Sequence, residues 1–102
     1  MSSDRTKTRR LSLGRLFLTQ SIIDLRPQLL GEIYPILMRH AECDWGDVSS
    51  EDREANERAL EDGSRILSVY HLTDGTKIWI ITDAEDANCR RPQTTVMLPS
   101  DY

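Results

Sequence analysis

The sequence is poor in the residue types on which many kinds of site depend. It has two cysteines and five glycines in 102 residues, and each glycine stands alone. Two cysteines exclude a disulfide scaffold, and isolated glycines argue against the phosphate-binding loops of nucleotide-binding folds. Long hydrophobic runs are also missing, because Ser12, Gly14 and Arg15 interrupt the stretch after Leu11. We therefore expect neither a signal peptide nor a membrane span.

Acidic residues outnumber basic ones, with 17 Asp and Glu against 13 Lys and Arg, which gives a formal charge of −4. Hydrophobic residues make up 38% of the sequence. This length allows one small domain, and the acidic balance argues against a generally basic nucleic-acid binder. Without an export signal, we expect a cytoplasmic protein whose Cys43 and Cys89 are reduced thiols. We expect no metal and no cofactor.

The charges are concentrated in separate segments. Residues 1–10 hold the basic side chains Arg5, Lys7, Arg9 and Arg10, and we expect them to form a disordered tail before a single domain over residues 11–102. Residues 40–62 hold two basic and nine acidic residues, a balance of −7. Such a segment repels nucleic acid locally and attracts basic protein surfaces.

The first half of the sequence predicts helices. A short helix is expected over residues 21–25, and apolar residues at helical spacing predict a longer one over residues 28–41. Pro35 interrupts the longer pattern, so we expect a kink or a late start there. Ser49 or Ser50 caps a third helix, which is polar on most of its surface and should lie at the domain edge.

The second half predicts strands. Residues 65–82 form a hairpin through Asp74 and Gly75, a pair typical of a type I′ turn with positive φ at both central residues. A further strand is expected over residues 93–98, and residues 15–19 can add another. Both faces of the second hairpin strand are apolar, which predicts a central position. The predicted fold class is therefore α+β, a small antiparallel sheet packed with two or three helices.

A cluster of possible metal ligands and catalytic groups lies in the acidic segment. His40, Cys43, Asp44 and Asp47 fall within eight residues, but the sequence has no paired Cys-x-x-Cys, so we predict no metal site. His40 is expected to close a helix C-terminus, where its positive charge is favourable. A small hydrolase-like enzyme that uses His40, Asp44 and Asp47 is one alternative to a binding function.

Trp45 lies among the acidic residues, where a large ring either fills the edge of the core or anchors a partner. The core interpretation is favoured. An exposed Trp ringed by carboxylates would contact a basic protein surface. The predicted binding residues are Asp44, Trp45, Asp47, Glu51, Asp52 and Glu54.

About two thirds of the chain, from Arg39 to Tyr102, resembles a family of small plasmid-related proteins carried on plasmids, integrative elements and phages of proteobacteria. The residues that carry the resemblance are Arg39-His40, Asp44-Trp45-Gly46-Asp47, Asn56-Glu57-Arg58-Ala59-Leu60, Arg65-Ile66-Leu67-Ser68-Val69-Tyr70, Asp74-Gly75-Thr76, Ile78-Trp79-Ile80-Ile81-Thr82 and Thr94-Thr95-Val96-Met97-Leu98-Pro99. The resemblance implies a genomic setting, a mobile genetic element, and no particular reaction.

The preferred interpretation is a non-enzymatic protein-binding module. In a mobile-element setting its partner is expected to be a host defence complex, of the restriction or CRISPR kind, which the acidic surface would inhibit. A nucleic-acid-associated accessory factor is the other alternative. The side chains that could contact nucleic acid are Arg5, Lys7, Arg9, Arg10, Arg90 and Arg91.

Overall fold

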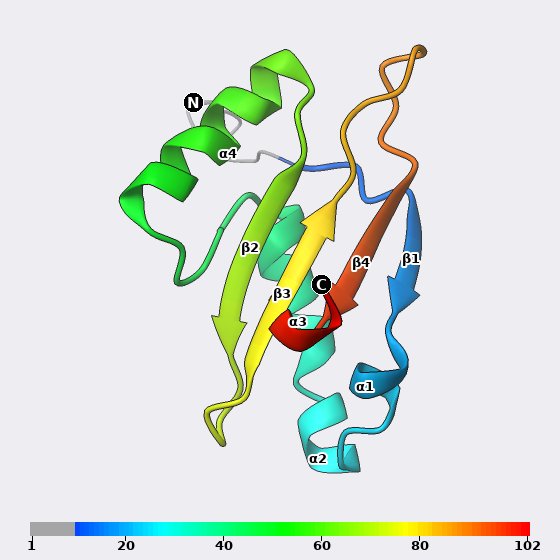
Figure 1. Cartoon of the computed structure of the whole chain (residues 1–102), viewed down its shortest axis with the longest axis vertical. Helices are drawn as coiled ribbons and strands as arrows, with labels where there is room; N and C mark the ends of the chain where they lie inside the picture. The colour runs from blue at the N-terminus through cyan, green and yellow to red at the C-terminus, as the bar shows by residue number, and fades with distance from the viewer. Residues whose placement is uncertain (1–9) are drawn as a thin grey trace, which may run out of the picture.

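A four-stranded sheet forms the centre of the molecule. The computed structural model describes residues 10–102, so the expected tail lies outside the described residues except for Arg10. Strands β1 (Arg15–Leu18), β4 (Gln93–Met97), β3 (Lys77–Thr82) and β2 (Ile66–His71) lie side by side in that order (Figure 1). The predicted α+β class is confirmed, and β3 is a central strand as expected.

One strand departs from the antiparallel sheet that the sequence predicted. The pairs β2–β3 and β3–β4 are antiparallel, but β1 runs parallel to β4. The sheet is therefore mixed. Hairpin strands joined by a short loop must be antiparallel, whereas β1 reaches the sheet through a long helical connection that permits either direction.

Four helices connect β1 to β2: α1 (Gln20–Ile23), α2 (Pro27–Leu30), α3 (Ile33–Ala41) and α4 (Ser50–Asp62). The helix expected over residues 28–41 is thus divided, and Pro35 lies in the first turn of α3, where a missing N–H breaks no intrahelical bond. Ser49 caps α4 by accepting a hydrogen bond from the Asp52 N–H (3.1 Å). No helix in residues 10–102 is long and apolar enough to cross a bilayer.

The hairpin loop between β2 and β3 differs from the predicted type I′ turn. The Gly75 N–H donates to the Leu72 carbonyl (2.8 Å), the Leu72 N–H donates to the Thr76 carbonyl (2.9 Å), and within the loop only Gly75 has positive φ (93°). These contacts define a three-residue loop. The Glu32 carboxylate of the α2–α3 turn accepts from both the N–H and the hydroxyl of Thr73 (2.9 and 2.6 Å), a tertiary contact that the local sequence does not reveal.

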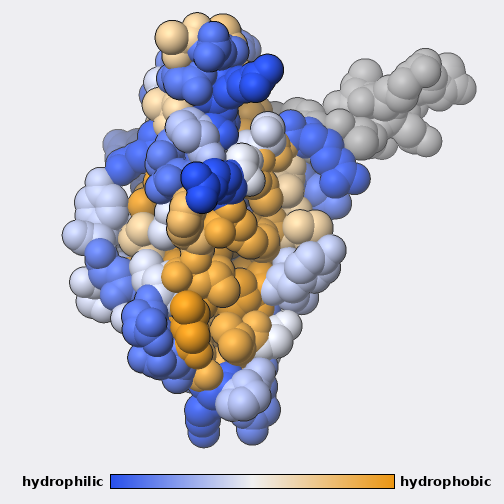
Figure 2. Space-filling view, turned by 90° about the vertical axis from the view of Figure 1, so that its right-hand side faces the viewer, coloured by the Kyte–Doolittle hydropathy of each residue, from blue (hydrophilic) through white to orange (hydrophobic). Residues whose placement is uncertain are grey.

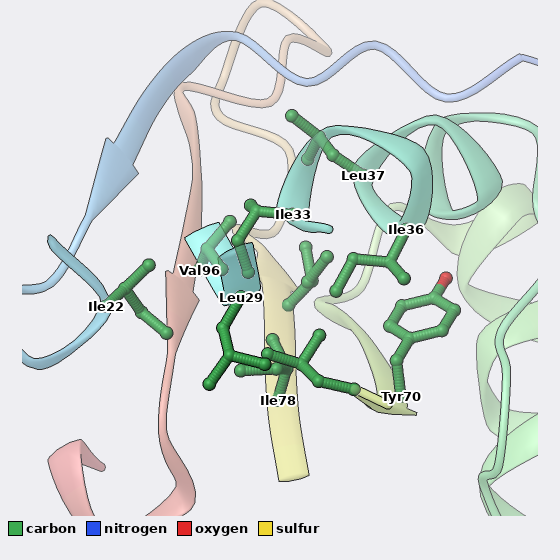
Figure 3. Packing of buried hydrophobic residues seen from close by; sticks show 10 residues of the cluster. Ile22, Leu29, Ile33, Ile36, Leu37, Tyr70, Ile78 and Val96 are labelled. Atoms are coloured by element: carbon green, nitrogen blue, oxygen red, sulfur yellow. The ribbon is translucent and has the colours of Figure 1, made fainter. Parts of the chain in front are cut away.

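The core lies between the sheet and helices α1 to α3, with α3 covering one face of the sheet (Figure 1). Buried side chains from helices and strands interdigitate there, as Figure 3 shows for Ile33 and Ile36 of α3 against Ile78 of β3. A second cluster lies under α4 and contains Leu11, Cys43, Trp45, Ala59 and Ile66. The molecule therefore has one main core and a smaller one that attaches α4.

Candidate functional site

The candidate site is an acidic surface, which we define as Asp44, Asp47, Glu51, Asp52 and Glu54, five exposed residues on α4 and on the loop before it. Helix α4 lies beside the outer edge of β2 (Figure 1). The Asn56 amide donates to the Leu67 carbonyl (2.7 Å) and accepts from the Leu67 N–H (3.2 Å). A side chain of α4 thus takes the place of a neighbouring strand and fixes the helix to the sheet.

The loop that carries Asp44 and Asp47 is fixed to the same strand. The Val69 N–H donates to the Trp45 carbonyl (3.1 Å), and the Asp47 N–H donates to the Val69 carbonyl (2.7 Å). The Trp45 indole N–H donates to the Glu57 carboxylate of α4 (2.9 Å). Loop and helix are therefore joined to each other as well as to β2, so the acidic surface has a rigid base.

The C-terminal end of α4 is held by Arg91. Its side chain is 7% exposed, and its guanidinium donates to the carbonyls of Ala59 (2.9 Å), Ser64 (2.7 Å) and Asp83 (3.1 Å). A positive charge near the carbonyls at the C-terminal end of a helix is favourable. Of the six basic residues considered for nucleic-acid binding, Arg91 is thus engaged inside the fold, while Arg10 and Arg90 are exposed.

The acidic surface has two electrostatically different parts. Asp44 accepts from the Arg39 guanidinium (2.8 and 3.3 Å), and this hydrogen bond holds the pKa of Asp44 below its usual value. Asp47 accepts from the His71 ring (2.8 Å). No ion pair in the described part of the chain includes Glu51, Asp52 or Glu54. The uncompensated negative charge therefore lies at the start of α4, where it also interacts favourably with the helix dipole.

Trp45 does not belong to this surface. Its side chain is 1% exposed and its ring meets the His40 ring edge-on, with centroids 6.0 Å apart. The ring fills the smaller core, as the favoured interpretation of the sequence held. Its inclusion among the predicted binding residues is therefore corrected: a side chain this deeply buried cannot touch a partner, and only the five acidic residues remain.

His40 is the centre of a buried polar network. It is 0% exposed, and its Nδ1 and Nε2 lie 2.6 Å from the Ser68 hydroxyl and 2.8 Å from the Thr82 hydroxyl. Thr82 is 2.7 Å from the Thr94 hydroxyl, which donates to the Leu13 carbonyl (2.8 Å). Thr94 gives its one proton to Leu13, so Thr82 must donate to Thr94 and accept from a protonated Nε2. In the neutral ring Nδ1 then accepts from the Ser68 hydroxyl.

This network gives His40 a structural role that differs from the two suggested by the sequence. Burial lowers the pKa of His40 from 6.5 to about 4, so the ring is neutral near pH 7 and carries no charge toward the helix C-terminus. Both ring nitrogens are occupied by hydroxyls, while Asp44 and Asp47 bind Arg39 and His71. The structure does not bring His40, Asp44 and Asp47 together as a catalytic set.

The described residues complete neither a metal site nor a pair of Cys89 with a histidine base. Within residues 10–102, no group of three or more His, Cys, Asp or Glu side chains could hold a metal ion. A pocket of about 470 Å³ lies between the segment before β1, α4 and the loop of residues 83–92, and is lined in part by Arg10, Cys89 and Arg90. Its lining includes no histidine, so Cys89 has no imidazole base there.

No family model, no curated protein and no solved structure matches this chain. The resemblance to plasmid-related proteins therefore stays a prediction.

Proposed function

We propose that the protein is a non-enzymatic protein-binding module whose acidic surface contacts a basic surface of another protein. The observation that carries the proposal is the exposed start of α4. Glu51, Asp52 and Glu54 have no cation partner among the described residues, although their helix is fixed to the sheet by Asn56 and Arg91. The backbone that carries these charges therefore needs no ordering when a partner binds.

The composition of α4 supports a contact role over a packing role. Of its 13 residues, only Asn56 and Ala59 are buried. The remaining surface of the helix is mostly charged and contributes little to the core. Negative charge on such a surface accelerates encounter with a basic partner and raises specificity more than it raises affinity.

The class of partner follows from the same charge. A protein that binds nucleic acid presents a basic groove, and an acidic helix can occupy that groove by replacing phosphates. We propose that the partner is such a protein, belonging to a host restriction or CRISPR defence complex, and that binding inhibits it. The resemblance of residues 39–102 to plasmid-related proteins supports the mobile-element setting.

The test compares two variants with the same change in charge. The triple variant Glu51→Gln/Asp52→Asn/Glu54→Gln removes the uncompensated charges, and Asp24→Asn/Asp83→Asn/Glu85→Gln removes three charges elsewhere. Partners captured from a host lysate are identified by mass spectrometry, purified, and titrated calorimetrically at low and high salt. We expect the first variant to bind a purified partner at least about tenfold more weakly, the control to bind as the wild type does, and salt to weaken binding.

The proposal fails if both triple variants bind alike, or if affinity is independent of salt. Retained folding of each variant is checked by circular dichroism. This check matters because removing acidic residues from the first turn of α4 costs up to about 1 kcal/mol each in helix stability.

A further inference from the structure

The outer edge of β1 is apolar and open. β1 is an edge strand, and the side chains of Leu16, Phe17 and Leu18 are 48%, 40% and 36% exposed, with Ile23 of α1 at 50%. Figure 2 faces this side of the molecule and shows apolar side chains gathered along it. An edge of this kind invites a further strand, because unpaired backbone groups lie beside apolar side chains.

The opposite edge of the sheet is closed. The outward backbone groups of β2 at Leu67 bind the Asn56 side chain, and those at Val69 bind the loop of residues 45–47. Proteins commonly cover an edge in this way to prevent unwanted pairing. Of the two edges, only that of β1 can therefore accept a strand.

The backbone of β1 offers a defined set of free groups. The Arg15 N–H donates to the Pro92 carbonyl (3.0 Å) and the Thr19 N–H donates to the Val96 carbonyl (3.1 Å), so these residues face the sheet. Alternation along a strand gives Phe17 the same direction and turns the N–H and C=O of Leu16 and Leu18 outward. Among the described residues, no hydrogen bond reaches those outward groups.

We propose that the edge binds a second copy of this chain, with the two β1 strands antiparallel across a two-fold axis. Pairing Leu16 of each copy with Leu18 of the other satisfies all the outward groups of both residues. This register places the axis beside Phe17, which then faces its own copy in a non-hydrogen-bonded pair with Cα atoms about 4.5 Å apart. The two sheets become one continuous sheet, and the contact is self-complementary as two-fold symmetry requires.

Charge favours a second copy over an unrelated strand. In this register Arg15 lies opposite Thr19 of the second copy. The Thr19 hydroxyl donates to the Asp101 carboxylate (2.7 Å) in each chain, so each Arg15 approaches an Asp101 carboxylate across the interface. The two Arg15 side chains stand at opposite ends of the strand pair and do not repel each other at close range. An unrelated strand has no reason to supply a carboxylate at this position.

The inference is independent of the proposed function, because the acidic surface lies along the β2 edge, at the other end of the sheet (Figure 1). Its first test is the mass of the full chain in solution, measured by sedimentation and light scattering from micromolar to near-millimolar concentration. We expect a concentration-dependent dimer. Phe17→Lys, which places two ammonium groups at the axis, should remain monomeric, while Tyr34→Lys, on an exposed residue of α3, should dimerise as the wild type does.

A cysteine pair tests the register. Phe17→Cys and Leu16→Cys are each made with Cys89→Ser, which removes the exposed native thiol. In the proposed dimer the two introduced thiols of Phe17→Cys are close enough for a disulfide, whereas the two residues at position 16 have Cα atoms about 8 Å apart, beyond disulfide reach. Mild oxidation should therefore link the Phe17→Cys chains at least about tenfold faster.

Three results would overturn the proposal: a wild-type chain that stays monomeric at every concentration, a dimer that Phe17→Lys leaves intact, or equal rates of linkage at positions 16 and 17. If the wild-type chain stays monomeric, the β1 edge remains available to a strand of another protein. Because the cysteine variants keep uncharged side chains, they decide the question even if Phe17→Lys does not fold.

Discussion

Gly46 and Gly75 both have positive φ, but only Gly46 also lacks space for a side chain. A Cβ on Gly46 (φ 73°) would lie 2.1 Å from the Val69 carbonyl oxygen and 2.7 Å from the Tyr70 ring, whereas Gly75 (φ 93°) has no atom within 4 Å. We predict that Gly46→Ala lowers the free energy of unfolding by more than about 3 kcal/mol, and Gly75→Ala by roughly 1 kcal/mol. Urea unfolding followed by Trp fluorescence measures both, and equal losses would contradict the close approach at Gly46.

The stability of the protein should depend on pH through His40. Burial lowers the pKa of His40 to about 4 in the folded protein, whereas the unfolded chain takes up this proton near pH 6.5. Between these values the unfolded state binds more protons, so the free energy of unfolding falls as pH falls. The expected loss from pH 6.5 to pH 4 is about 3 kcal/mol, with full stability from His40 present above pH 6.5.

His40→Gln isolates this effect, because an amide can donate and accept but does not titrate. The variant should be less stable than the wild type at pH 7, yet lose much less stability between pH 6.5 and pH 4. Urea titrations at several pH values in this range give both curves. Parallel curves for the two proteins would show that His40 is not the titrating group.

At the scale of elements, the attachment of α4 to β2 depends on one amide. Asn56→Ala leaves the N–H and C=O of Leu67 without their partner, and we predict a loss of roughly 2–3 kcal/mol. Asn56→Asp should also destabilise, because a carboxylate cannot donate to the Leu67 carbonyl. Faster hydrogen exchange at the Leu67 amide would locate the change. Arg53→Ala, on an exposed residue of the same helix, is the control and should alter stability by less than about 0.5 kcal/mol.

The ends of a helix could be predicted where the sequence carries a local signal, such as a cap residue or a terminal glycine, and could not be predicted where it carries none. Helix α4 has a Ser cap and ends before Gly63 in the left-handed conformation (φ 80°), as the sequence indicates. Helix α3 ends at Ala41, and two residues later Cys43 has φ 67° and its N–H donates to the His40 carbonyl (3.0 Å). That position normally holds Gly, and a buried Cys occupies it here because its side chain fills the smaller core.

At the scale of the whole molecule, the two edges of the sheet differ in chemistry. The β2 edge is closed and carries the acidic surface, while the β1 edge is open and apolar. If both proposals hold, the dimer presents two acidic surfaces at its far ends, and each can bind a partner without blocking the other. A partner with two basic sites would then bind the dimer more tightly than it binds Phe17→Lys.

The sequence by itself determined the α+β class, the caps of α4, the central position of β3 and the location of the negative charge, because caps, periodicity and charge are local properties. Only the tertiary structure decided that β1 is parallel to β4, that Trp45 is buried, that His40 is neutral between two hydroxyl groups, and that Arg91 holds the end of α4. These outcomes depend on contacts between segments far apart in the chain, and such contacts set burial, strand direction and hydrogen-bond partners.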